Sequence, residues 1–297
     1  MPPILVFGGD GQLGRELSAR AAQVGIPLVG VRRSEADIAD AGAIASAMAR
    51  ISPSLVVNAA AYTKVDRAEI EVEAAYRSNA KGPGIIAAAC SATGVPLVHI
   101  STDYIFDGTK QTAYCEDDAI SPLGIYGQSK AAGESAVREA HQQHVILRTS
   151  WVYGVYGANF LKTILRLATQ REELSVVADQ RGCPTGTQDI ADAILKIAPR
   201  LAAREPVWGT YHFAGSGATT WHGFAVEIVA AQAKFTTRRP KVTAITTAEY
   251  PTPAKRPINS ELDSSHFAAI FGFRAADWRE RTREVVSVLL SSRGETS

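Results

Sequence analysis

Three glycines near the N-terminus, Gly8-x-x-Gly11-x-x-Gly14, constrain the fold of this chain more than any other stretch. They stand between a short apolar run at 4–7, which predicts a buried parallel strand, and residues 12–24, whose apolar side chains recur at helical spacing. Glycines permit positive φ and let backbone amides approach a phosphate, and a helix N-terminus adds positive potential. A strand, a glycine turn and a helix in this order predict a dinucleotide site.

The rest of the first half alternates strands and helices. We expect strands at 28–31, 55–57, 97–100 and 145–148, and helices at 41–50, 74–93 and 126–140, although Gly82-Pro83-Gly84 weakens the third of these. This alternation predicts an α/β fold of the Rossmann type, a doubly wound parallel sheet joined by right-handed crossovers. Ligands of such sheets lie beyond the carboxyl ends of the strands.

The pattern loosens after residue 148. We expect helices at 159–170, 188–201, 221–234 and 278–290, strands at 174–177 and 210–214, and an irregular proline-rich stretch at 246–260. Residues 1–150 therefore form the predicted dinucleotide-binding domain, and residues 151–297 form mainly a smaller C-terminal, substrate-binding lobe. Two later segments, about 172–200 and 208–216, are expected to return to the first domain.

The end of the second predicted strand bears on the choice between NAD and NADP. A carboxylate there would bind the ribose 2′-hydroxyl, whereas an arginine accommodates a 2′-phosphate. Arg32 and Arg33 follow the strand, and no acid appears before Glu35, so NADPH is the expected cofactor, with NADH as the alternative. Asp37 and Ile38 are candidate adenine contacts, because a carboxylate accepts from the exocyclic amine and an apolar side chain packs on the ring.

Tyr126 and Lys130 lie four residues apart and therefore on one face of the predicted helix. An ammonium near a phenol favours the phenolate, so we expect Lys130 to lower the pKa of Tyr126 and suit it to general acid–base catalysis. Thr102 follows the strand at 97–100 and completes a hydroxyl–phenol–amine set. In such a set Thr102 holds the substrate oxygen, Tyr126 protonates it and Lys130 holds the nicotinamide ribose.

Composition excludes several classes of protein. The 297 residues are 46% hydrophobic and 21% charged with a net charge of +1, which argues against nucleic acid or an anionic membrane as a partner. No apolar run approaches the roughly 18 residues of a membrane span, and the N-terminus lacks the basic segment of a signal peptide. Three widely spaced cysteines predict neither a disulfide framework nor a zinc site, so we expect a cytoplasmic protein.

Several longer motifs resemble the dTDP-4-dehydrorhamnose reductases, a family of extended short-chain dehydrogenases/reductases. In the first half these are Gly11-Gln12-Leu13-Gly14, Asn58-Ala59-Ala60-Ala61-Tyr62-Thr63, Ser101-Thr102-Asp103-Tyr104 and Tyr126-Gly127-x-x-Lys130. In the second half they are Arg148-Thr149-Ser150-Trp151, Asp179-Gln180-x-Gly182-x-Pro184-Thr185 and Tyr250-Pro251-Thr252-Pro253-Ala254-x-Arg256-Pro257. The similarity extends from about residue 4 to residue 285, and the motifs of the second half are more specific than those of the fold.

The resemblance implies an enzyme that reduces the C4 ketone of dTDP-4-dehydro-β-L-rhamnose with NAD(P)H, the last step of dTDP-L-rhamnose synthesis. It implies that the cofactor is bound by Gly11, Gln12, Leu13, Asp37, Ile38, Ala61, Tyr62, Thr63, Ile100, Tyr126 and Lys130. The glycine turn and the end of the second strand add Gly8, Gly14 and Arg32 to the predicted cofactor site. The sugar nucleotide would be bound by Thr102, Asp103, Trp151 and Arg256. An indole suits the apolar face of a deoxysugar, and a guanidinium suits the diphosphate, although an ion pair within the protein is the alternative for Arg256.

The same resemblance bears on metal and assembly. Some members of the family are thought to hold Mg²⁺ with glutamates at a dimer interface, and Glu16 matches one such position. Gln188 stands where a second glutamate would be, and an amide is a poorer ligand for a hard cation. We therefore expect no essential metal, and either a monomer or a homodimer.

Two other functions stay open at this stage. An epimerase or dehydratase of the same superfamily would keep NAD bound and reoxidise it in each turnover. A non-catalytic regulatory subunit of the same fold would have no need of Thr102, Tyr126 and Lys130 together, and all three are present.

Overall fold

The computed structural model describes residues 2–291, so residue 1 and residues 292–297 of the two predicted domains lie outside it. Within this range a six-stranded sheet forms in the order β10-β5-β4-β3-β1-β2, with every neighbouring pair parallel. Its strands are β1 (Ile4–Phe7), β2 (Leu28–Val31), β3 (Leu55–Asn58), β4 (Leu97–Thr102), β5 (His144–Thr149) and β10 (Gly209–His212). The order reverses between β1 and β3, as in a Rossmann-type fold, which confirms the predicted fold class.

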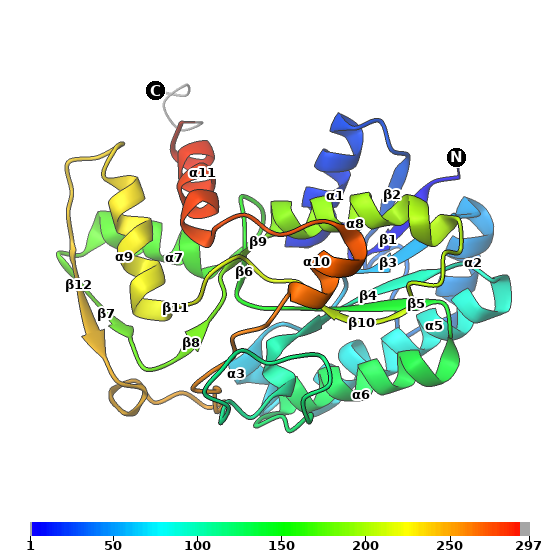
Figure 1. Ribbon diagram of the computed structural model, residues 1–297, viewed down its shortest axis with the longest axis horizontal. Helices are drawn as coiled ribbons and strands as arrows, with labels where there is room; N and C mark the ends of the chain where they lie inside the picture. Colours follow the sequence, from blue (N-terminus) through cyan, green and yellow to red (C-terminus); the bar gives the residue numbers. More distant parts are fainter. Residues whose placement is uncertain (1, 292–297) are drawn as a thin grey trace.

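Helices cover both faces of this sheet (Figure 1). One face packs against α1 (Gln12–Gln23) and α8 (Thr187–Ala202), and the other packs against α2 (Ala41–Ile51), α5 (Gly82–Thr93) and α6 (Ile125–Ala140). Alternate residues of one strand serve the two layers, because successive strand side chains point to opposite faces: Ile4 and Val6 join the first cluster, Leu5 and Phe7 the second.

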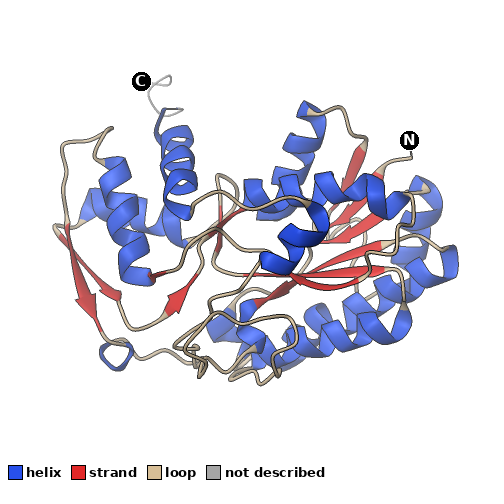
Figure 2. Ribbon diagram, in the orientation of Figure 1, coloured by secondary structure: helices blue, strands red, loops and turns tan. Residues whose placement is uncertain are grey.

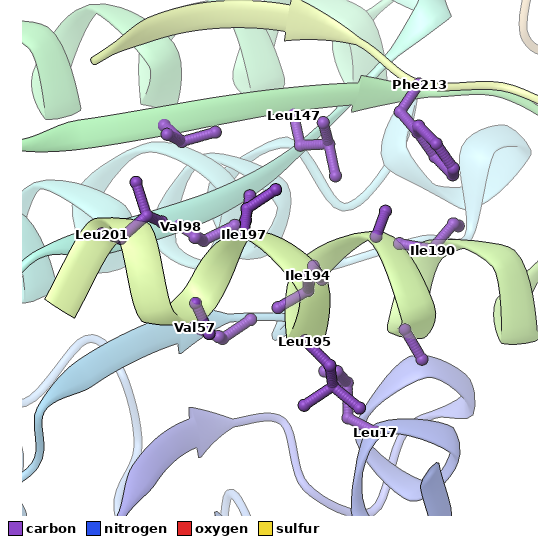
Figure 3. Packing of buried hydrophobic residues seen from close by; sticks show 14 of the residues in the cluster. Leu17, Val57, Val98, Leu147, Ile190, Ile194, Leu195, Ile197, Leu201 and Phe213 are labelled. Carbon is purple, nitrogen blue, oxygen red and sulfur yellow. The ribbon is translucent and has the colours of Figure 1, made fainter. Parts of the chain in front are cut away.

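Helix α8 lies in the centre of the first layer. Figure 3 shows Ile190, Ile194 and Ile197 directed at the sheet, while Leu195 meets Leu17 of α1. Ten of its side chains are buried, which requires apolar residues on more than one side of the helix. α8 packs on the sheet and β10 is one of its strands, so both belong structurally to the first domain although they follow residue 151 in the sequence.

The smaller lobe forms at the other end of the molecule (Figures 1 and 2). Its helices are α7 (Phe160–Gln170), α9 (Trp221–Gln232) and α11 (Trp278–Ser291), and these enclose a separate apolar cluster. Its strands β7 (Glu173–Val177) and β12 (Lys241–Ile245) pair in parallel. The expectation that residues from about 172 return to the first domain is wrong for β7, whose alternately exposed and buried side chains fit the edge of the lobe, not a sheet covered on both faces.

Short elements connect the two parts. β6 (Val152–Tyr153) pairs with β9 (Thr185–Gly186), and β8 (Arg181–Gly182) pairs with β11 (Thr219–Thr220). α3 (Val65–Ala68), α4 (Val72–Tyr76), the π-helical turn η1 (Arg77–Lys81) and the 3₁₀ turns η2 (Asp103–Ile105) and η3 (Thr247–Glu249) lie in the long connections. α10 (Ser265–Phe271), which the sequence did not predict, buries Phe267 and Phe271 in the first core cluster.

Candidate functional site

A cleft of about 790 Å³ opens at the carboxyl ends of the strands. Most of the predicted site residues line it: Gly8, Gly11, Gln12, Leu13, Asp37, Ile38, Ala61, Thr63, Ile100, Thr102, Asp103, Tyr126, Lys130 and Trp151. The lobe completes the wall with residues such as Asn159, whose side-chain amide donates to Gln12 Oε1 at 2.9 Å. The fold thus brings together residues as far apart in the sequence as Gly8 and Trp221.

The glycine turn forms one end of the cleft. Gly8 has φ +84°, and a Cβ there would come within 2.7 Å of the Ala60 nitrogen. A Cβ on Gly14 would come within 2.2 Å of the Gly8 oxygen, so Gly14 lies behind the turn and allows α1 to pack closely against it. No side chain caps α1 at Gly11. Backbone amides of the first turn are therefore available to an anion, and the turn fits a dinucleotide pyrophosphate.

The turn after β2 presents Arg33 to the cleft, whereas Arg32 does not line it. The Arg33 guanidinium lies 3.6 Å from Asp37 Oδ2, and Arg77 of the π-helical turn donates to the same oxygen at 2.9 Å. A backbone hydrogen bond from Ala39 and the two guanidinium charges lower the pKa of Asp37. Asp37 is therefore a carboxylate at neutral pH, set between two cations.

Thr102, Tyr126 and Lys130 meet in the middle of the cleft. Thr102 is the last residue of β4, and its hydroxyl donates to Asp103 Oδ1 at 3.0 Å. Tyr126 and Lys130 lie in the first two turns of α6, and both line the same cleft wall. The Lys130 side chain is buried, and its Nζ donates to the backbone oxygen of Ile100 at 2.6 Å.

The protonation of this trio differs from the prediction. Burial raises the pKa of Tyr126 to about 12, against an opposing hydrogen bond with Thr102, and the charge of Asp103 raises it further. Burial lowers the pKa of Lys130 to about 8, and the Glu134 carboxylate opposes that shift. The expectation that Lys130 acidifies Tyr126 is therefore wrong here, because the ammonium is directed at the Ile100 carbonyl. A phenol that keeps its proton at neutral pH is suited to donating it.

Asp103 is a buried carboxyl group beside the trio, only 2% exposed. Burial raises its pKa to about 7, while hydrogen bonds with Ser260 and Thr102 work in the opposite direction. Within residues 2–291, its Oδ2 atom has no hydrogen-bond partner. Asp103 lines the cleft, and a ligand hydroxyl that reached this enclosed oxygen would complete its hydrogen bonding, as the predicted sugar-binding role requires.

A buried ionic network holds α6 to the sheet behind the trio. Glu134 accepts from the Ser101 hydroxyl at 2.5 Å and from two nitrogens of Arg148, at 3.0 and 2.8 Å. Burial alone would raise the pKa of Glu134, but the hydrogen bonds and charge of Arg148 outweigh it and lower the pKa. Because Ser101 and Arg148 lie on β4 and β5, the network ties the helix that carries Tyr126 and Lys130 to the strand that carries Thr102.

Two predicted ligands lie elsewhere. The Tyr62 hydroxyl donates to Glu71 at 2.5 Å, and Tyr62 does not line the cleft, although its chain neighbours Ala61 and Thr63 do. Arg256 pairs with both oxygens of Asp66, at 2.9 and 2.8 Å, and does not line the cleft. This is the ion pair that the sequence left open as the alternative for Arg256, and it joins the proline-rich segment to α3.

Trp151 stands at the junction between β5 and the lobe. Its φ of +46° lies in the left-handed region, which costs a non-glycine residue about 1–3 kcal/mol. Trp221 and Phe160 line the cleft beside it, and sequence reasoning assigned neither of them to the site. Both begin helices with ordinary polar caps, Thr220 and Asn159, so no spacing or motif could single them out.

Glu16, which was considered as a metal ligand, already has a hydrogen-bond partner. Glu16 accepts from the Thr187 hydroxyl at 2.9 Å, and burial raises its pKa. Across residues 2–291, no group of three or more His, Cys, Asp or Glu side chains could hold a metal ion. In the same range, no helix is both long and apolar enough to cross a membrane.

Known proteins are similar to this chain in both sequence and fold. Residues 1–291 match the family model described as the RmlD substrate binding domain. The dTDP-4-dehydrorhamnose reductase of Sinorhizobium fredii is 43% identical over 289 residues, 97% of each chain.

Two solved structures are also similar. A dTDP-4-dehydrorhamnose reductase from Clostridium acetobutylicum has a TM-score of 0.90 at 36% identity, covering 97% of this chain and 99% of that one. One from Bacillus anthracis, solved in complex with NADP, has a TM-score of 0.89 at 35% identity, covering 96% and 98%.

Proposed function

The chain belongs to the RmlD substrate-binding domain family, and from that premise we propose that it is a dTDP-4-dehydrorhamnose reductase. It reduces the C4 ketone of dTDP-4-dehydro-β-L-rhamnose to the alcohol of dTDP-L-rhamnose, the last step of dTDP-rhamnose synthesis, with a reduced nicotinamide cofactor. The observation that carries the proposal is the single cleft in which the glycine turn, the Thr102–Tyr126–Lys130 trio and Trp151 face one another.

The glycine turn and the open amides of α1 would hold the cofactor's pyrophosphate. Lys130 would hold its ribose, because an ammonium has three N–H donors and can bind Ile100 and a ligand hydroxyl together. When bound, a reduced nicotinamide supplies the hydride that converts the ketone carbon to an alcohol carbon.

The chain's own residues supply the proton. Thr102 would turn its hydroxyl from Asp103 to donate a hydrogen bond to the ketone oxygen and orient it, and Tyr126 would give that oxygen its phenolic proton. The raised pKa of Tyr126 keeps this proton in place at neutral pH. Asp103, which lines the cleft next to Thr102, would bind a sugar hydroxyl near the reacting carbon.

NADPH is the cofactor that the site favours, with NADH as the alternative. The Bacillus anthracis relative was solved with NADP, and Arg33 contributes a guanidinium at the end of β2, where a 2′-phosphate would lie. Arg77 stands behind it and neutralises Asp37, which reduces the repulsion between that carboxylate and a phosphate. We place the enzyme in the cytoplasm as a monomer or homodimer that needs no metal.

The test is a coupled measurement of cofactor and sugar. The purified protein is mixed with dTDP-4-dehydro-β-L-rhamnose and NADPH, and NADPH absorbance and the product sugar are followed together. We expect one dTDP-L-rhamnose formed for each NADPH oxidised. An epimerase would instead alter the sugar without consuming added cofactor, and a regulatory subunit would do neither, so either result would refute the reductase.

A further inference from the structure

The cleft wall on the lobe side is aromatic. The indoles of Trp151 and Trp221 stack with their ring centroids 3.6 Å apart and their planes 7° from parallel. Phe160 lies against Trp221 with its ring centroid at 4.7 Å and a tilt of 53°. All three side chains line the cleft that holds Tyr126 and Thr102, and we call them the aromatic wall.

The paired short strands β8 and β11 position the two groups that pack on Trp151, the backbone of Gly182 and the indole of Trp221. A Cβ on Gly182 of β8 would come within 2.5 Å of Trp151 Cε2, so the backbone of β8 lies directly against this indole. β8 pairs with β11 in the register Thr219 to Gly182, and Trp221 follows β11 at once. The Thr220 hydroxyl accepts from the Gly223 amide and fixes the start of α9.

This arrangement covers Trp151. Its indole is only 9% exposed, because the β8 backbone and the Trp221 ring occupy its surroundings. Trp221 is half-buried and therefore has more surface available in the cleft. A ligand that meets the aromatic wall contacts Trp221 or Phe160, or alters the stack between the two indoles, and Trp221 offers the larger ring system.

We propose that Trp221 is a further sugar-binding residue, whose indole, held by its stack on Trp151, receives the apolar face of the dTDP-sugar. The inference rests on the proposed function, since it names the side chain that receives the sugar of that reaction. Ring C–H groups and a methyl group pack well on an indole, and packing of this kind contributes to ground-state and transition-state binding alike. The sugar nucleotide, and not the cofactor, should therefore be sensitive to residue 221.

Steady-state kinetics of Trp221→Ala and Trp221→Phe separate the two ligands. We expect Trp221→Ala to raise KM for the dTDP-sugar about tenfold, with kcat within about threefold and KM for NADPH unchanged. Trp221→Phe should recover most of the loss. Trp208→Phe is the matched control, because Trp208 packs on the sheet core away from the cleft and should change neither KM.

Circular dichroism gives a readout that does not depend on turnover. Two stacked indoles produce an exciton couplet in the far ultraviolet, and we expect dTDP-L-rhamnose to change it in the wild type but not in Trp221→Phe, which has no couplet to change. A normal KM for the sugar in folded Trp221→Ala, equal rises in both KM values, or a wild-type couplet indifferent to dTDP-L-rhamnose would overturn the proposal. Absence of reductase activity in the wild type with a ligand-sensitive couplet would refute the proposed function alone.

Discussion

At the scale of single residues, Asp103 combines burial with a position on the cleft wall. Its pKa of about 7 in the folded protein lies above the 3.8 of a free aspartate, so the folded state binds the proton more tightly than the unfolded chain. The stabilisation is complete below pH about 4 and is lost as the pH rises towards 7. A difference of about three pKa units corresponds to at most roughly 4 kcal/mol.

Asp103→Asn should remove this pH dependence, because an amide cannot ionise. We expect the melting temperature of the variant to rise relative to that of the wild type as the pH increases from about 4 to about 8. Melting curves of both proteins across that range check the expectation. Parallel pH dependences would mean that Asp103 is not a buried titrating group.

Arg33 and Arg32 form a natural pair of test and control. Arg33→Ala should raise KM for NADPH about tenfold, the effect of losing a hydrogen bond to a charged group, and leave KM for NADH nearly unchanged. Arg32→Ala should alter neither, since Arg32 does not line the cleft. Equal effects of Arg33→Ala on the two cofactors would show that Arg33 makes no contact with a 2′-phosphate.

The sequence could predict residues that stand directly at strand ends or within the glycine turn, because the topology fixes where those positions lie. Thr102, Gly8 and Gly11 are examples, and they line one cleft. It could not distinguish Arg33 from Arg32, since only the path of the turn after β2 decides which guanidinium faces the cleft. Nor could it find Trp221, whose place depends on the pairing of two very short strands.

At the scale of elements, α6 depends on its ionic tie to β5. Arg148 and Arg138 both donate to Glu134 Oε2, at 2.8 and 2.6 Å, but their side chains are 2% and 37% exposed. Without Arg148, the buried Glu134 carboxylate keeps only the partly solvated Arg138 as a guanidinium partner, whereas without Arg138 it keeps the buried Arg148. The two arginines should therefore differ greatly in their contribution to stability.

Arg148→Met should lower the free energy of unfolding by about 3–5 kcal/mol, and Arg138→Met by no more than about 1 kcal/mol. Urea unfolding followed by fluorescence measures both variants under the same conditions. Similar losses in the two variants would show that burial of the Glu134–Arg148 pair does not govern the stability of this helix–strand contact.

The longer helices with a clear apolar face, such as α1 and α6, begin and end within about two residues of the predicted bounds. Gly82-Pro83-Gly84 weakens the predicted helix at 74–93, yet helical structure continues through α4, η1 and α5, from Val72 to Thr93. The π-helical turn η1 ends just before α5, so Pro83 falls among its first residues, where a missing N–H is tolerated. The sequence did not predict β12 and α10, because elements this short are determined by tertiary packing and show no clear periodicity of apolar residues.

At the scale of the whole molecule, the sheet and the lobe each supply part of one site. The sheet carries the glycine turn and Thr102, α6 carries Tyr126 and Lys130, and the lobe adds the aromatic wall. The alternation of strands and helices predicted the first part in outline. The arrangement of the lobe depends on pairings between distant segments, β7 with β12 and β8 with β11, which no local pattern reports.

Turnover of Tyr126→Phe tests most directly whether this cleft reduces a ketone with Tyr126 as its proton donor. The variant keeps the ring and loses only the hydroxyl, so we expect its melting temperature and NADPH binding to match the wild type. Its kcat with dTDP-4-dehydro-β-L-rhamnose should fall at least about 100-fold, the scale expected for a lost general acid. A folded variant that binds NADPH and turns over at nearly the wild-type rate would contradict this mechanism.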